Sequence, residues 1–234
     1  MTETNGKSST KLDIRDIISI ILNILIAVFT ICGTYAMLTN DKSGTGLTAS
    51  GIEDLKFFTV LSNEICGITA VLWLIFRIMG RKFPILPKLM AAAAVGLTFI
   101  IIAAFLAPMY PEMDMYEGGN FWFHLIVPIT GMAEFMLLKT DEKIPFRYTV
   151  ISALPALVYG ICYLVNILVN GVGEWPDTND WYGFLNWGYP IGMVIFTAVV
   201  LMDLGMAVLL RALNSLVSGL MLGRNYKDHK PSQR

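Results

Sequence analysis

Apolar residues fall into six long runs along the chain, separated by short polar segments. Each run holds about 20 mostly apolar residues, the length that an α-helix needs to cross about 30 Å of hydrocarbon. The pattern therefore predicts an all-α, polytopic membrane bundle of six transmembrane helices. The predicted spans are 17–38, 57–78, 87–108, 121–138, 148–169 and 188–210.

The regions outside the runs complete the predicted organisation. Residues 1–16 form a polar N-terminal tail and 17–210 the transmembrane domain. The first run is longer than the apolar core of a cleaved signal peptide (about 7–15 residues) and lacks its small-residue cleavage site, so we interpret it as the first span. After the sixth run, apolar residues recur at helical spacing, which predicts an interfacial amphipathic extension and a basic tail over 211–234.

Composition agrees with a membrane protein. Hydrophobic residues make up 55% of the chain and charged residues only 15%, whereas a soluble domain carries about 25% charged residues. The net charge of −1 gives no basic excess that would attract nucleic acid. The expected surroundings are therefore a bilayer and its lipids.

Basic residues are divided unequally between the two sides of the predicted bundle. Fifteen of the 17 lysines and arginines lie on the side of the two termini, and only Lys42 and Lys56 lie on the other. By the positive-inside rule both termini face the cytoplasm, and the chain is a multi-pass protein of the cytoplasmic membrane. The outer loops instead carry acidic residues, which we expect to form a solvated face: Asp41, Glu53, Asp54, Glu112, Asp114, Glu117, Glu174, Asp177 and Asp180.

Apart from Arg77 and Lys88, which stand at the ends of their spans, four acidic or histidine residues lie inside the predicted spans, and each is a functional candidate because such groups are costly in hydrocarbon. They are Glu64, His124, Glu134 and Asp203. Glu64 fits either a structural pair or the lining of a polar cavity. Glu134 and Asp203 reach a similar depth and could share a proton, because two like charges there would be unfavourable.

Thr59 and His124 each lie two or three residues inside the outer end of a span, and are therefore level if spans two and four are neighbours. Ser62 and Asn63 follow Thr59 at spacings that place them on the same helix face. Pro128 removes the N–H that would bond the carbonyl of His124, which predicts a locally opened helix there.

No metal or cofactor site is expected from the sequence. The three cysteines, Cys32, Cys66 and Cys162, all lie within apolar runs and are interpreted as packing residues. The chain has no CxxC pair and no metal-ligand spacing.

Three short motifs resemble a known family. Residues 56–63 read Lys-Phe-Phe-Thr-Val-Leu-Ser-Asn, residues 120–128 read Asn-Phe-Trp-Phe-His-Leu-Ile-Val-Pro, and residues 181–186 read Trp-Tyr-Gly-Phe-Leu-Asn. In this order and with six spans, they resemble a bacterial six-transmembrane family distantly similar to the androgen-induced-protein family of intramembrane threonine hydrolases. The proline follows the histidine by four residues here and by about five in the eukaryotic pattern, and Gly183 replaces the usual proline of the third motif.

The resemblance implies an enzymatic function. The family's eukaryotic members cleave fatty acid esters of hydroxy fatty acids with an intramembrane threonine as nucleophile and a histidine as its partner. These roles fall on Thr59 and His124 here, and Glu134 matches an acidic residue of the fourth span. The resemblance therefore implies a lipid ester hydrolase that works in the outer leaflet on a fatty acyl ester.

The chemistry agrees with these residue types. A hydroxyl nucleophile needs an adjacent base, which a histidine of ordinary pKa supplies at neutral pH. A donor is also needed for the oxyanion, and Ser62, Asn63 and Asn120 are the candidates.

Two other functions remain as alternatives. A proton-linked transporter or channel would use Glu64, Glu134 and Asp203 along a polar path, although the chain has no internal repeat. A non-catalytic scaffold would instead close the bundle around Thr59. An apolar pocket of roughly 300 Å³ or more that holds both Thr59 and His124 would favour the enzyme.

Overall fold

The computed structural model describes residues 13–39, 51–140, 143–174 and 178–228, with side chains to residue 220. This part of the chain is all-helical, with 80% helix and no strands. Five helices are long and apolar enough to cross a membrane: Ile14–Thr39, Phe58–Ile78, Ile85–Met109, Phe146–Asn170 and Tyr189–Leu220. The prediction of an all-helical, multi-pass membrane protein is confirmed.

The first two of these helices are α1 (Ile14–Thr39) and α2 (Phe58–Ile78), and the short 3₁₀ helix η1 (Gly51–Lys56) precedes α2. The third and fourth are each built from more than one element, and the fifth is part of a single long helix. The remaining elements are α3 (Ile85–Ile101), η2 (Ile102–Leu106), α4 (Ala107–Met109), α5 (Gly118–Phe121), η3 (Trp122–Ile126), α6 (Val127–Leu137), α7 (Phe146–Ser152), α8 (Leu154–Asn170) and α9 (Tyr189–Asp228).

The fourth expected span is a helix, but it is not one of the five apolar ones. Elements α5, η3 and α6 follow one another without a break over 118–137. This segment packs against α1 and α3, and both His124 and Glu134 within it are buried. Polar residues such as His124 and Glu134 lower the hydropathy of this segment relative to the other five helices.

Two π-helical turns interrupt the long helices, each directly before a proline. The Val127 N–H bonds the carbonyl of Trp122, and the Ala107 N–H bonds the carbonyl of Ile102, one residue beyond the α-helical partner. Pro128 and Pro108 come next and supply no N–H. The opened helix expected around His124 is therefore present, as the π turn η3.

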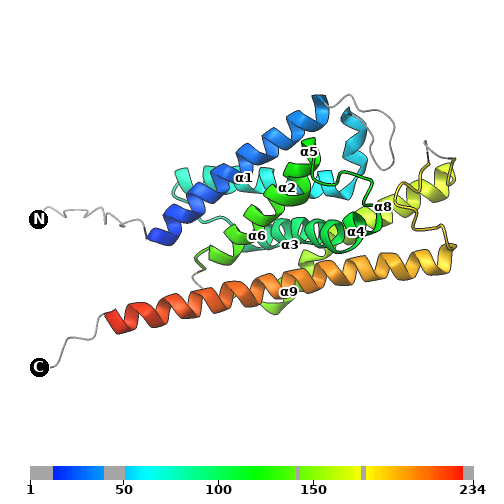
Figure 1. Cartoon of the computed structure of the whole chain (residues 1–234). Helices are drawn as coiled ribbons and strands as arrows, with labels where there is room; N and C mark the ends of the chain where they lie inside the picture. The colour runs from blue at the N-terminus through cyan, green and yellow to red at the C-terminus, as the bar shows by residue number, and fades with distance from the viewer. Residues whose placement is uncertain (1–12, 40–50, 141–142, 175–177, 229–234) are drawn as a thin grey trace, which may run out of the picture.

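Helix α3 lies at the centre of the bundle and packs against α2, α6, α7 and α9 (Figure 1). Its residues 91–94 are four consecutive buried alanines, and small side chains let helix backbones approach closely. Apolar side chains on the outer faces of α1, α8 and α9 are widely exposed, as lipid-facing residues are. The core therefore follows α3.

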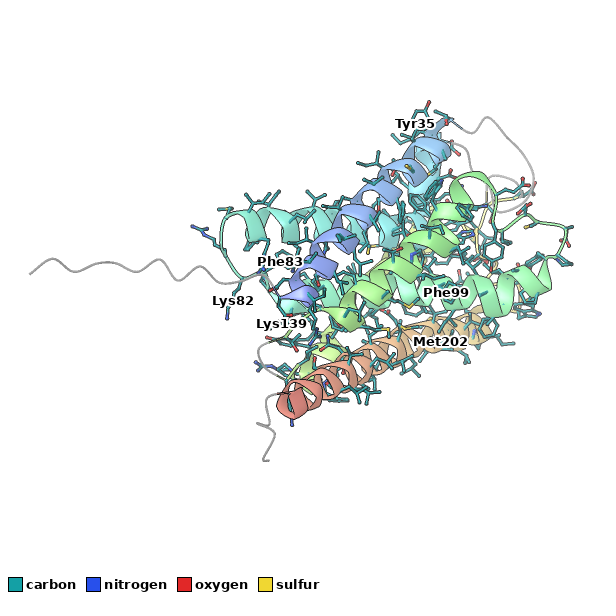
Figure 2. All side chains as sticks on the ribbon, turned by 60° about the vertical axis from the view of Figure 1, so that its left-hand side comes forward. Tyr35, Lys82, Phe83, Phe99, Lys139 and Met202 are labelled. Atoms are coloured by element: carbon teal, nitrogen blue, oxygen red, sulfur yellow. The ribbon has the colours of Figure 1, made fainter. Side chains whose placement is uncertain are left out.

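Helix α9 runs for 40 residues, a length of about 60 Å, and continues past residue 210 without a break. It ends at the same end of the molecule at which α1 begins (Figure 1). Lys82 and Lys139 lie at this end too, and Tyr35 lies at the opposite end (Figure 2). The described chain thus begins and ends on one side of the bundle.

Candidate functional site

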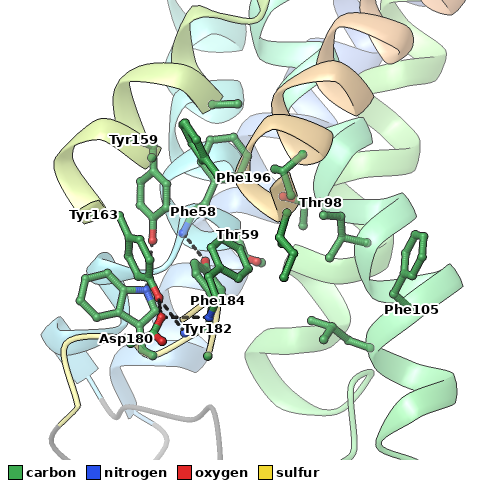
Figure 3. Close-up of a pocket in the computed structure, with 18 of the residues that line it drawn as sticks. Phe58, Thr59, Thr98, Phe105, Tyr159, Tyr163, Asp180, Tyr182, Phe184 and Phe196 are labelled. Carbon is green, nitrogen blue, oxygen red and sulfur yellow. Dashed lines mark hydrogen bonds between the residues drawn. The ribbon is translucent and has the colours of Figure 1, made fainter. Parts of the chain in front are cut away.

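A cavity of about 780 Å³ lies at the end of the bundle opposite to that at which α9 ends. Its walls come from the start of α2, from α3 and η2, from α8, from the first half of α9, and from segment 178–186 before α9 (Figure 3). Most lining side chains are apolar or aromatic. Thr59 and Thr98 lie between the tyrosines on one side and Phe105 on the other (Figure 3).

Asp180 organises the loop that borders the cavity. Its carboxylate accepts hydrogen bonds from the backbone N–H groups of Phe184 (3.0 Å) and Leu185 (2.8 Å) and from the Tyr163 hydroxyl. The side chain is buried although it lies in an outer loop. The expectation that the acidic loop residues form a solvated face is therefore wrong for Asp180, because the turn after it needs an acceptor for its N–H groups.

Two tyrosines connect this loop and α8 to the start of α2. The Tyr182 hydroxyl accepts from the Phe58 N–H at 2.8 Å. The Tyr159 hydroxyl donates to the Lys56 carbonyl at 2.6 Å and accepts from the Trp181 indole N–H at 3.2 Å. Burial raises the pKa of Tyr182 well above its ordinary value, so its hydroxyl stays neutral. These bonds hold in place the helical turn that carries Thr59.

Thr59 lines the cavity, and its hydroxyl makes no hydrogen bond within the described residues. Its carbonyl accepts from Ser62 Oγ (3.0 Å) and Asn63 Nδ2 (2.7 Å). The backbone N–H groups of Thr59 and Val60, in the first turn of α2, also have no acceptor in the described chain. A free hydroxyl therefore lies beside two free N–H donors.

His124 is buried, and its Nδ1 lies 2.6 Å from the carbonyl oxygen of Met115. A carbonyl oxygen only accepts, so the proton is on Nδ1 and the lone pair on Nε2. His124 is not among the residues that line the cavity, and no hydrogen bond joins its ring to the Thr59 hydroxyl in the described structure. Within the described structure the two side chains are therefore not hydrogen-bonded to each other, and only Thr59 lines the cavity.

Asn63 links the segments that carry these two residues. Its Nδ2 donates to the carbonyl of Thr59 and, at 2.9 Å, to the carbonyl of Phe123, the residue before His124. The two oxygens therefore lie less than about 6 Å apart. Both amide hydrogens are used, and Oδ1 is buried without a partner within the described chain.

The other two oxyanion candidates are also engaged. Ser62 Oγ bonds Thr98 Oγ1 at 3.0 Å as well as the carbonyl of Thr59. Asn120 Nδ2 lies 3.4 Å from the carbonyl of Asp114. Thr98 lines the cavity, but Ser62, Asn63 and Asn120 do not.

The intramembrane acids lie apart from the cavity lining. Glu64 accepts from the Thr34 hydroxyl of α1. Glu134 binds Lys88 of α3 at 2.8 Å and Asn23 of α1 at 2.8 Å, so both of its oxygens are used. Asp203 is fully buried, and within the described residues neither of its oxygens has a hydrogen-bond partner. Glu134 and Asp203 are therefore not hydrogen-bonded to each other.

Several residues of the site have weak signals in the sequence. Tyr159 and Tyr163 are four residues apart on an apolar run, a spacing that places both on one face of α8. Asp180 directly precedes the third motif, and Lys88 looks like the edge of a span although it is buried with Glu134. Within the described chain no group of three His, Cys, Asp or Glu side chains could hold a metal ion.

Comparisons with protein-family models, with curated proteins and with solved structures found no match for this chain.

Proposed function

We propose that the chain crosses the cytoplasmic membrane six times with both termini inside, and that it hydrolyses a fatty acyl ester in the cavity, with Thr59 as the nucleophile and His124 as the base. The observation that carries the proposal is the unbonded Thr59 hydroxyl in the lining of a largely apolar cavity of about 780 Å³. Cavities that bury small molecules have volumes of roughly 300–1,000 Å³.

An acyl chain would lie along the apolar part of the cavity, among Ile101, Phe105 and Phe196. Phe105 is 48% exposed, so this part of the lining also reaches the outer surface of the bundle. A lipid could enter there from the hydrocarbon and bring its ester group to Thr59.

Deprotonation of Thr59 requires an acceptor, and the tautomer of His124 supports this role. The Met115 carbonyl fixes the proton on Nδ1 and leaves Nε2 free to accept the threonine proton. The two groups must approach each other when substrate fills the cavity. The π turn that carries His124 supports such a movement, because its hydrogen bonds are already out of α-helical register.

The attack would proceed in two stages. Thr59 Oγ1 adds to the ester carbonyl carbon while its proton moves to Nε2, and the alcohol then leaves with that proton. Water, deprotonated by the same nitrogen, hydrolyses the acyl-threonine and restores the hydroxyl. The free N–H groups of Thr59 and Val60 would bind the developing oxyanion, the role that the sequence assigned to Ser62, Asn63 or Asn120.

A hydrolase activity probe on the purified protein tests this proposal. Thr59→Ala and His124→Ala should each abolish labelling, whereas Thr59→Ser should retain part of it. Thr98→Ala is the matched control, because it removes another hydroxyl from the same cavity and should leave labelling within about twofold of wild type. Labelling that survives in Thr59→Ala would exclude Thr59 as the nucleophile.

Proton-linked transport is the second candidate, and Asp203 is the observation that favours it. A buried carboxyl group without a hydrogen-bond partner in a membrane helix is a natural proton-binding group. Proton flux into liposomes that is lost in Asp203→Asn but kept in Thr59→Ala would favour transport over hydrolysis.

A further inference from the structure

The charged and aromatic groups of the cavity carry an inference about the head group of its ligand, one that extends the proposed function. Asp180 is the only acidic residue in the lining, and no lysine, arginine or histidine lines it within the described chain. Its carboxylate oxygens accept hydrogen bonds from three donors, Tyr163 and two backbone N–H groups. An anionic ligand would find no positive side chain here.

Aromatic rings surround the same end of the cavity. Five side chains in mutual ring contact form an aromatic cluster, all of them in the cavity lining: Tyr159, Tyr163, Trp181, Tyr182 and Phe184. The faces of such rings carry negative partial charge and attract cations, most strongly quaternary ammonium groups. Figure 3 shows Asp180 beside Tyr163 and Tyr182.

Two further acidic residues lie next to the cavity lining in the sequence. Glu112 and Asp114 flank Met113, a lining residue, and both are exposed. Lys56 is outside the lining, with its ammonium 5.8 Å from the Trp181 ring and 5.6 Å from the Phe57 ring. An ammonium group of the chain itself thus already lies against one ring of the cluster.

We propose that the cavity binds single-chain amphiphiles with a quaternary ammonium head, the apolar chain lying among α3, η2 and α9 and the head between Asp180 and the aromatic cluster. Where the proposed hydrolysis also holds, the substrate is an acyl ester that carries this ammonium, either as an acylcholine or as a choline phospholipid. Fatty acids and anionic phospholipids are then poor ligands.

The test measures binding separately from hydrolysis. Wild-type protein in a neutral maltoside detergent is titrated, with native mass spectrometry as the readout, against non-cleavable ether analogues that share one alkyl chain. Their heads are choline, phosphocholine, glycerol and phosphoglycerol. Both choline heads should bind about tenfold tighter than the glycerol and phosphoglycerol heads, the scale of one desolvated cation–π contact. Comparing the affinities of the choline and phosphocholine heads then shows whether the cavity also accommodates the phosphate.

Charge variants complete the test. Val172 lines the cavity, and its side chain is 43% exposed. Val172→Lys should therefore add a positive charge without removing a hydrogen bond. It should weaken binding of the choline heads by about tenfold and strengthen binding of phosphoglycerol, whereas the neutral control Val172→Gln should change neither. Asp180→Asn should lower choline binding in the same way.

The outcomes separate this inference from the proposed hydrolysis. Equal binding of all four heads, or a preference for phosphoglycerol, overturns the inference whatever the activity probe shows. A choline preference that Val172→Lys reverses supports it, even when no ester is cleaved.

Discussion

The buried ion pair between Lys88 and Glu134 shows how single residues connect the helices of this bundle. The pair is 2.8 Å long, and both side chains are at most 5% exposed. Asn23 bonds both partners, and the Lys88 ammonium lies 5.3 Å from the Trp73 ring. Residues of α1, α2, α3 and α6 therefore meet at one charged cluster, in which each charge is compensated.

Removing one partner should cost much more than removing both. Lys88→Met or Glu134→Gln leaves a buried group uncompensated, which costs about 3–5 kcal/mol, and the double variant should be less destabilised than either single one. Equilibrium unfolding in a denaturing detergent measures the stability of the two single variants and of the double variant.

The pair between Lys139 and Asp13 is the matched control, since its side chains are 48% and 42% exposed. Asp13→Asn should cost less than about 1 kcal/mol. Equal losses of unfolding free energy in the variants of the two pairs would show that burial does not decide how much an ion pair contributes to stability.

At the residue scale, the sequence predicts which polar side chains lie within the helices better than it predicts the groups that they contact. Thr59 and His124 were singled out by depth, and the structure brings their backbone segments together through Asn63. The partner of Glu134 was missed, because Lys88 stands at the edge of an apolar run and edge lysines usually reach the interface. Hydropathy records the residue type but not the direction of its side chain.

At the element scale, close contacts between helices depend on glycine. A Cβ added to Gly33 of α1 would overlap the ring of Phe123 in η3, next to His124. A Cβ added to Gly205 of α9 would meet no other atom within 4 Å. These two glycines therefore allow a controlled comparison of packing with helix propensity.

Gly33→Ala should destabilise the protein by about 1–3 kcal/mol, because the Phe123 ring must move within a packed interface. Gly205→Ala should be neutral or stabilise by up to about 1 kcal/mol, since alanine favours the helix. Thermal unfolding in detergent measures both. If the proposed function holds, Gly33→Ala should also reduce probe labelling through the displaced η3, and an unchanged melting temperature in this variant would contradict the packing argument.

The elements themselves were largely predictable, because most spans are apolar throughout. The π turns follow from Pro108 and Pro128, and a proline is visible in any sequence. The cavity was not predictable in the same way. It depends on how far α8 stands from α3 and α9, and on a loop organised by the hydrogen bonds of Asp180.

At the scale of the whole molecule, the topology depends on the segment 118–137. Five helices are apolar enough to span, which alone would place the two ends of the chain on opposite sides. Helix α1 nevertheless begins at the end where α9 finishes (Figure 1). A sixth crossing by 118–137 reconciles the two observations, and the unequal distribution of lysine and arginine favours the same arrangement.

Labelling of single cysteines tests this crossing directly. Glu117 and Lys143 are exposed and lie just before and just after the segment. With Cys32, Cys66 and Cys162 replaced by alanine, Glu117→Cys should react with a membrane-impermeant maleimide in intact cells, and Lys143→Cys only after permeabilisation. Gly173→Cys and Arg81→Cys, in loops at opposite ends of other spans, provide the outer and inner references. If Glu117→Cys and Lys143→Cys label from the same side, the segment does not cross, and the Thr59–His124 site would lose the outer-leaflet position on which the proposed chemistry depends.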